Sequence, residues 1–169
     1  PAGSYDQTIC TDITGFTGRN DADLAICQAV FEHVRDVNKA FIALTTILKP
    51  DGVAAVFVPS RNALYARLNL LLPETVKKVL LDKIFPHTQA DYGFKAYYNR
   101  CTPRDFEAIA SRHGLETVDK RLYFTSAYFS FCFPCYIIWR LWILLFHLLA
   151  GQQAAETFCM AFRKISQAR

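Results

Sequence analysis

Histidine and cysteine side chains give this sequence its clearest opportunities for chemistry. His33 and His87 are two of four histidines, and an imidazole can accept or donate a proton near neutral pH. Cys132 and Cys135 have the CxxC spacing of metal and redox sites, but no second ligand pair accompanies them and their surroundings are apolar. We therefore predict that these cysteines are packing residues, that no metal is bound, and that His33 serves either a site or the fold.

The elements that must position such residues begin with the segment from Asp23 to Pro59. Its apolar residues follow the pattern of a buried strand, then of an amphipathic helix, then of a strand again. A Lys-Pro-Asp-Gly sequence ends the helix, because proline cannot continue it and Asp-Gly favours a turn. Two strands joined by one helix are expected to lie parallel, with a right-handed crossover. The predicted parts are a strand (24–27), a helix (30–48), a turn (49–52) and a second strand (53–58).

The same segment resembles one family of enzymes. The sequences DLAICQAVFEHV (residues 23–34) and ILKPDG (47–52) are similar to the fourth strand, the following helix and the fifth strand of the class I S-adenosylmethionine-dependent methyltransferases. The resemblance implies an α/β fold with a Rossmann-like, doubly wound sheet. It also implies that residues 8–13 form the family's third strand, and we expect them to line up with the two strands above in a single sheet.

The resemblance further implies a binding site for S-adenosyl-L-methionine. The Asp12 carboxylate would accept the adenine amine while the backbone at Ile13 contacts a ring nitrogen; otherwise Asp12 only caps a turn. Backbone groups of Cys27 and Gln28 would face the methionine and sulfonium part, because ligands bind at the carboxyl ends of parallel strands. The family's first two strands and glycine-rich loop have no counterpart in the sequence. We therefore expect part of a methyltransferase domain, with N-terminal strands missing, that alone binds the cofactor poorly.

Residues 61–100 follow the second strand and are expected to form a lid over a substrate. Long insertions after a strand often carry function, and this one ends in a loop rich in aromatic and charged residues. His87, Tyr97 and Tyr98 are the residues that we expect to contact substrate, unless the insertion only packs against the domain. The two helices predicted within it span 63–72 and 73–84.

The C-terminal part of the chain is expected to complete the sheet. Thr102 and Pro103 should begin a helix that ends at Arg112, with threonine as its cap and proline in its first turn. Further strands are predicted at 115–124 and 156–162. The resemblance implies that the last strand is antiparallel and lies between the family's fifth and sixth strands.

A hydrophobic insertion, residues 125–151, separates those last two strands. Residues 127–149 could cross a bilayer if they were fully helical, but both flanking strands must pair on one side of a membrane. Pro134 interrupts the segment, and Arg140 is costly in hydrocarbon. We therefore predict a bent, in-plane or re-entrant hairpin at the membrane interface, with its tryptophans and tyrosines among the headgroups. The alternative is a core or dimer surface.

Composition limits the other functions of the chain. Its 169 residues fit one domain, and a hydrophobic content of 52% supplies a core. The formal charge of +4 is modest and spread along the sequence, which argues against a nucleic-acid partner and is compatible with an anionic membrane surface. Cys10 and Cys27 fall in predicted buried strands, so we expect free thiols in a reducing compartment. The expected location is cytoplasmic, peripheral or monotopic on the inner face of the membrane.

The function implied by the resemblance is transfer of a methyl group to a small or lipid-linked acceptor at a membrane surface. Such transfer depends on proximity and alignment, so no protein nucleophile is expected. For a hydroxyl acceptor, His33 or His87 would be the base. The alternative is a non-catalytic, membrane-associated binding or scaffold protein with a degenerate methyltransferase fold. Reading the encoding DNA upstream of Pro1 for a GxGxG segment distinguishes the two.

Overall fold

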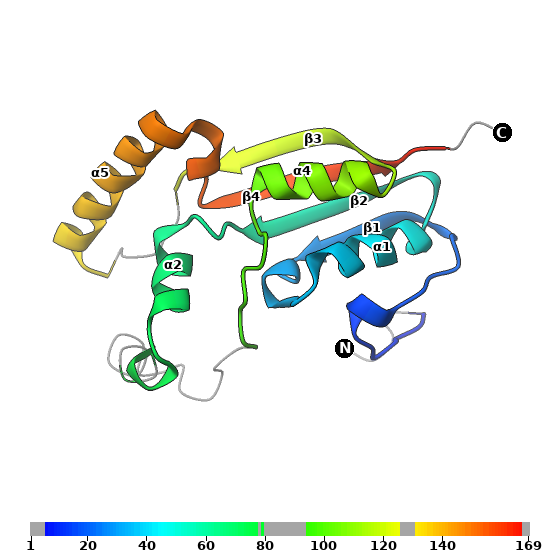
Figure 1. Cartoon of the computed structure of the whole chain (residues 1–169), viewed down its shortest axis with the longest axis horizontal. Coiled ribbons are helices and arrows are strands. Elements are labelled where there is room, and N and C mark those ends of the chain that lie inside the picture. Colours follow the sequence, from blue (N-terminus) through cyan, green and yellow to red (C-terminus); the bar gives the residue numbers. More distant parts are fainter. Residues whose placement is uncertain (1–5, 78, 80–93, 126–130, 167–169) are drawn as a thin grey trace.

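A four-stranded sheet forms the centre of the computed structural model, which describes residues 6–77, 79, 94–125 and 131–166. β1 and β2 are parallel, whereas β4 is antiparallel to both of its neighbours. The predicted parallel pair is therefore observed, and so are the predicted place and direction of the last strand. The strands are β1 (Ala22–Gln28), β2 (Leu48–Pro59), β3 (Leu115–Tyr123) and β4 (Thr157–Lys164), in the spatial order β1-β2-β4-β3 (Figure 1).

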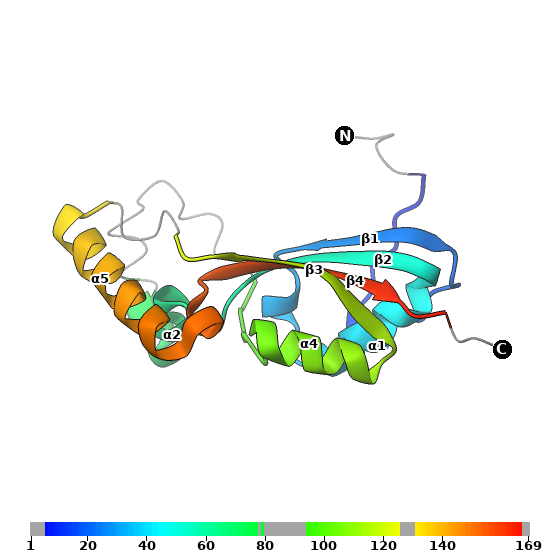
Figure 2. The same ribbon diagram turned by 90° about the horizontal axis from the view of Figure 1, so that it is seen from above.

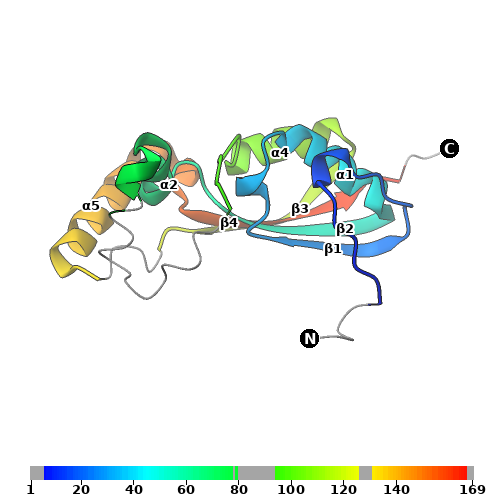
Figure 3. The same ribbon diagram turned by 90° about the horizontal axis from the view of Figure 1, so that it is seen from below.

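Helices cover one face of this sheet and extend beyond one end of it. α1 (Val37–Ile47) and α4 (Pro103–Arg112) lie on the same face (Figure 2). α2 (Leu64–Leu71) and α5 (Phe133–Ala150) lie beyond the carboxyl end of β2, away from the rest of the sheet (Figure 3). The short 3-10 helices are η1 (Ile13–Gly15), η2 (Phe31–His33) and η3 (Gly151–Ala154).

Five buried phenylalanines attach the helices to the sheet. The ring centroids of Phe31, Phe41 and Phe106 are 5.2 Å apart in each pair. On β4, Phe158 lies 5.1 Å from Phe106 and Phe162 lies 5.4 Å from Phe41. Alternate residues of a strand point to the same face, so the pattern Phe-Cys-Met-Ala-Phe on β4 places both phenylalanines under the helices. This cluster holds η2, and with it the end of β1, in a fixed position.

Residues 8–13 are not a strand, so one of the three segments expected in the sheet is absent from it. The segments 24–27 and 53–58 do line up, with Leu24 opposite Val53 and Cys27 opposite Val56. Residues 6–12 are exposed, and the Asp12 side chain accepts a hydrogen bond from the Thr14 backbone at 2.8 Å, which begins η1. In the described part of the chain, β1 pairs only with β2, so no neighbouring strand stabilises an extended 8–13 segment.

The helix between β1 and β2 is shorter than predicted, and β2 is longer. α1 begins at Val37 instead of residue 30, because the Asp36 side chain accepts a hydrogen bond from the Lys39 backbone at 3.1 Å and caps the helix there. β2 begins at Leu48 and includes the predicted turn 49–52. Asp51 has a φ of +64° within it, so this part of β2 is irregular. A Cβ atom at Gly52 would lie 2.9 Å from the Ala22 carbonyl oxygen, which explains why a glycine fits here.

The hydrophobic insertion forms one continuous helix and no hairpin within its described residues. α5 runs without interruption from Phe133 to Ala150, and Pro134 lies in its first turn. A backbone N–H has no helical partner in that turn, so proline begins the helix there and does not break it. The predicted break at Pro134 is therefore wrong, whereas the predicted helical character of the insertion is observed; its residues 126–130 lie outside the described residues.

The predicted lid is described only in part. Its first helix, expected at 63–72, is α2. Of the second, expected at 73–84, residues 74–77 are helical, and most of the remainder lies outside the described residues together with His87. The described end of the lid, residues 94–100, packs against η2.

Lys164, at the C-terminal end of β4, binds the C-terminal end of α1. Its ammonium group donates hydrogen bonds to the Asn20 side chain at 2.6 Å and to the Thr45 and Leu48 carbonyl oxygens at 2.7 and 2.9 Å. The two carbonyls belong to the last turn of α1 and its cap, where a cation is favourable.

We expect Lys164→Met to lower the free energy of unfolding by about 1.5–3 kcal/mol, because hydrogen bonds from a charged group contribute on that scale. Urea denaturation measures the change. Lys39→Met is the control, since Lys39 is exposed in the first turn of α1. Equal stability of the two variants would contradict the role given to Lys164.

Candidate functional site

The carboxyl ends of β1 and β2 are the place where a ligand of this sheet is expected. Gln28 ends β1 with an exposed side chain, whereas Cys27 is buried. Burial raises the pKa of the Cys27 thiol to about 11, so this thiol is neutral and only the Cys27 backbone can face a ligand. Both observations agree with the roles predicted for these residues, which remain predictions.

A sharp turn after Gln28 lifts the chain out of the sheet and into η2. Ala29 has a φ of +52°, which is uncommon for a residue other than glycine. Its backbone N–H donates to the Phe57 carbonyl oxygen at 2.9 Å. Because this bond anchors the turn to β2, the next residues, including Glu32 and His33, are held at the carboxyl edge of the sheet.

Glu32 is a buried carboxyl group that the sequence did not single out. Its residue is only 4% exposed, and its Oε2 atom has no hydrogen-bond partner among the described residues. Burial raises the pKa of Glu32 above its ordinary value. Its Oε1 atom lies 3.9 Å from Nε2 of His33, too far for a direct hydrogen bond. The pair places two titratable groups next to each other where a ligand is expected.

The loop 94–100 packs against this pair and brings the predicted tyrosines to it. The Glu32 carbonyl oxygen accepts hydrogen bonds from the backbones of Tyr97 at 2.7 Å and Tyr98 at 3.0 Å. Nδ1 of His33 lies 3.1 Å from the Lys95 carbonyl oxygen. Tyr98 is buried in the core, whereas Tyr97 is half-buried. The structure therefore unites His33, Tyr97 and Tyr98 with Glu32, and Tyr97 is the tyrosine that keeps an accessible surface.

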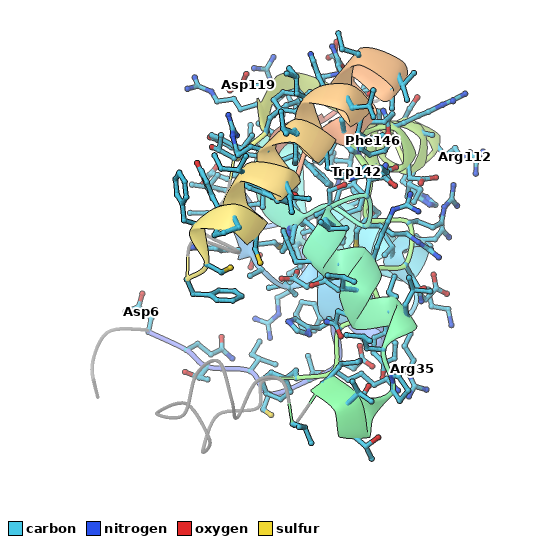
Figure 4. The ribbon with its side chains drawn as sticks, turned by 90° about the vertical axis from the view of Figure 1, so that its left-hand side faces the viewer. Asp6, Arg35, Arg112, Asp119, Trp142 and Phe146 are labelled. Carbon is cyan, nitrogen blue, oxygen red and sulfur yellow. The ribbon has the colours of Figure 1, made fainter. Side chains whose placement is uncertain are left out.

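Two cations lie against the ring of Tyr97. The Arg35 guanidinium carbon is 5.1 Å from the ring centroid and the Lys95 ammonium nitrogen is 5.8 Å from it, both within the range of cation–π attraction. Arg35 and Lys95 are otherwise exposed, and Figure 4 shows Arg35 at the surface below α2. These contacts make the rim beside His33 positively charged.

Asp12 and Ile13 do not reach the same edge. They belong to η1 and its cap, which lie beside α1 and not beside η2 (Figure 1). Asp12 is exposed, and its hydrogen bonds from Thr14 lower its pKa. Within the described residues Asp12 thus acts as the turn cap considered for it, and adenine recognition by Asp12 and Ile13 remains a prediction.

The cysteines are free thiols, as expected, but their surroundings differ from the prediction. Cys10 and Cys135 are exposed and Cys132 is intermediate, whereas Cys27 and Cys101 are buried. Cys10 is exposed because residues 8–13 do not join the sheet. Cys135 lies on the exposed side of the first turns of α5, so it does not fill a core.

The Glu32→Gln variant is expected to change how stability depends on pH. Burial raises the pKa of Glu32 in the folded protein above its unfolded value, so the folded state holds the proton more tightly. The free energy of unfolding should therefore fall as the pH rises from the unfolded pKa through the folded one. In the glutamine variant this fall should disappear, and the protein should be more stable at neutral pH. Urea denaturation from mildly acidic to neutral pH measures both effects; parallel curves for the two proteins would contradict the prediction.

Comparison with known proteins finds one family model that matches part of the chain. Residues 4–56 match the family model described as "Methyltransferase domain". This range contains β1, α1 and most of β2, the unit on which the sequence interpretation rests. A search of curated proteins finds no match.

Two solved structures with TM-scores above 0.5 share the fold at low sequence identity. An S-adenosylmethionine-dependent methyltransferase from Mesorhizobium loti is 12% identical, with a TM-score of 0.53 over 90% of this chain and 67% of that one. One from Methanosarcina mazei is 13% identical, with a TM-score of 0.52 over 93% and 66%. The 1,6-didemethyltoxoflavin-N1-methyltransferase of Burkholderia thailandensis, solved with 1,6-didemethyltoxoflavin and S-adenosylhomocysteine, is 11% identical, with a TM-score of 0.48 over 94% and 50%. The chain thus spans 50–67% of the length of these structures.

Proposed function

We propose that this chain, which has the class I S-adenosylmethionine-dependent methyltransferase fold, takes part in transferring a methyl group to a small or lipid-linked acceptor at a membrane surface. The observation that carries the proposal is the β1-α1-β2 unit with the Glu32–His33 pair at its carboxyl edge. The fold alone does not fix a reaction, so acceptor and membrane contact are argued from this chain's own residues.

The carboxyl end of β1 fits one part of the implied cofactor. Gln28 and the Cys27 backbone can face its methionine end, which supplies the methyl group when the cofactor is bound. The adenine end has no contacts at this edge among the described residues, because Asp12 and Ile13 lie beside α1. The chain's own residues then orient the acceptor near Gln28 and exclude water, and proximity and alignment supply the catalysis.

α5 supports the membrane part of the proposal. Its only buried residues are Trp139 and Ile143, and most other large side chains of the helix are exposed. The segment Phe133–Ala154 is also long and apolar enough to cross a membrane, judged by length and composition alone. Because β3 and β4 are paired, with Tyr123 opposite Thr157, both ends of α5 return to one sheet. A helix lying in the plane of the interface satisfies this constraint.

α2 adds exposed apolar side chains to those of α5. Leu68, Leu70 and Leu71 are exposed on it, and α2 and α5 lie at the same end of the molecule (Figure 3). Trp142 and Phe146 lie on the flank of α5 nearest α2 (Figure 4), with their rings stacked at 6.0 Å. Neither helix contains an acidic residue, and Arg67 and Arg140 give both a positive charge that suits anionic headgroups.

A second function is favoured by one observation. Asp12 and Ile13 lie away from Gln28, so the described residues do not assemble a whole cofactor site. A non-catalytic, membrane-associated binding or scaffold protein with a degenerate methyltransferase fold would need none.

The test incubates the chain, and in parallel the product of its whole reading frame, with S-adenosylmethionine labelled in the methyl group and with a membrane lipid extract. Label that enters the organic phase supports a lipid-linked acceptor. Label found only in water-soluble product overturns the lipid-linked acceptor and retains the enzyme. A reading frame without a glycine-rich loop, together with no transfer, supports the binding or scaffold protein.

A further inference from the structure

The geometry points to a binding site for a hydroxyl group between the Glu32 carboxylate and Nε2 of His33. Resting on the function proposed above, we infer that this hydroxyl belongs to the methyl acceptor. The site combines the Oε2 atom of Glu32, which has no hydrogen-bond donor among the described residues, with Nε2 of His33. A ligand hydroxyl supplies the missing donor.

The tautomer of His33 follows from its partner. Nδ1 lies 3.1 Å from the Lys95 carbonyl oxygen, and a carbonyl oxygen can only accept a hydrogen bond. The proton of a neutral imidazole is therefore on Nδ1, and Nε2 carries a lone pair. That lone pair lies on the side of the Glu32 carboxylate, whose Oε1 atom is 3.9 Å from Nε2.

Glu32 has acceptor capacity that the described residues do not use. Its Oε2 atom is buried and has no hydrogen-bond partner among them. The nearest thiol does not fill this need, because the Cys101 Sγ atom lies 3.6 Å from the Phe31 carbonyl oxygen and 3.5 Å from that of Asn99. A buried polar atom without a partner in a native protein indicates a ligand, a water or a catalytic role.

The charges around the pair favour a neutral donor over a cationic one. Arg35 and Lys95 lie against Tyr97 at the rim of the site. Farther inside, burial and the charge of Glu32 raise the pKa of the Cys101 thiol, on which Arg61 and Asp105 act in opposite directions. An ammonium group would be attracted by an ionised Glu32 but repelled by the two rim cations, whereas a hydroxyl would meet no repulsion from them. His33, with its side chain 33% exposed against 5% for Glu32, forms the outer side of the site.

The first experiment tests whether Glu32 and His33 form one site. The Glu32 carboxyl carbon, labelled with 13C, is titrated by NMR in the wild type and in His33→Gln. Burial raises the pKa of Glu32, and the positive charge of His33 in its protonated form lowers it, so we expect His33→Gln to raise it further. His113→Gln is the matched control, because His113 bonds to the Asn38 side chain at 2.8 Å, and it should leave Glu32 unchanged. An unchanged Glu32 pKa in His33→Gln would overturn the pairing.

The second experiment tests the ligand with phenol, toluene and benzylammonium as probes. Phenol should shift the Glu32 carboxyl resonance in a saturable manner, and Glu32→Gln should abolish phenol-induced shifts of the His33 ring. Toluene, which has the same shape without the hydroxyl, and benzylammonium should leave both resonances in place. Equal responses to phenol and toluene, or a stronger response to benzylammonium, would overturn the proposal. A phenol response in a protein that transfers no methyl group would retain the site and reject its role in methyl transfer.

Discussion

Replacing Trp139 by alanine is expected to lower the free energy of unfolding by about 3–5 kcal/mol, the range for truncating a large buried aromatic side chain. Trp139 is 1% exposed and is one of two buried residues that hold α5 on the domain. Its indole nitrogen also donates a hydrogen bond at 2.9 Å to the Glu156 carboxylate, which is itself completely buried. The variant therefore loses apolar burial, leaves a cavity and removes a donor from a buried carboxylate.

Trp142→Ala is the matched control, because Trp142 belongs to the same helix and is 46% exposed. Its loss should change the free energy of unfolding by about 0.5 kcal/mol or less, as at other surface positions. Both values come from urea denaturation followed by far-UV circular dichroism. A Trp142→Ala effect as large as that of Trp139→Ala would mean that the flank of α5 that carries Trp142 packs on protein, which would contradict the proposed membrane face.

Replacing Leu141, Leu145 and Leu148 together by glutamine is expected to weaken binding to vesicles by about 100-fold or more. These side chains are 62%, 51% and 75% exposed, and their spacing places them along one face of α5. Burying one leucine contributes about 1.5–3 kcal/mol, and each 1.4 kcal/mol is tenfold in affinity. Glutamine keeps the helix, because its helix propensity is close to that of leucine.

Co-sedimentation with phosphatidylcholine–phosphatidylglycerol vesicles measures this effect. The control variant changes Ile42, Val118 and Ile165 to glutamine, three exposed apolar residues outside α5, and should bind as the wild type does. Equal sedimentation of the wild type and the α5 variant would contradict the proposal that α5 binds a membrane. A wild-type dimer that the α5 variant converts to monomers would assign the face to a second copy of the chain instead.

Local sequence patterns predicted the elements whose stabilising contacts are close in sequence. The α4 boundaries follow from Thr102, whose side chain accepts from the Asp105 backbone at 3.1 Å, and from Pro103 in the first turn. The β1-α1-β2 unit follows from its hydrophobic periodicity. The direction of β4 came from the family resemblance, since periodicity alone does not orient a strand.

The predicted secondary structure was wrong where a strand needed a neighbouring strand that the sequence does not show, or where a helix cap stabilised a different local conformation. Residues 8–13 have strand-forming residues but no neighbouring strand among the described residues, so the Asp12 cap determines their conformation. Asp36 delayed the start of the predicted helix through the same kind of bond. Pro134 was interpreted as a helix breaker because the sequence does not show that the helix begins one residue before it.

The burial of Glu32 could not be predicted from neighbouring residues for a related reason. In the sequence Phe-Glu-His it has the appearance of a solvated residue on the polar side of a helix. Its burial depends on the loop 94–100, which returns from far along the chain to bond with the Glu32 carbonyl. The Glu-His dipeptide directly after a buried parallel strand was the signal available, and only His33 was selected from it.

We propose that the carboxyl edge of β1 faces the methionine end of the cofactor. Titrating S-adenosylhomocysteine into 15N-labelled protein, with adenosine as the matched probe, tests it most directly, because NMR detects weak binding. We expect saturable shifts of the Cys27 and Gln28 amides with S-adenosylhomocysteine and none with adenosine. Shifts that are absent from both amides, or the same for both compounds, would contradict it.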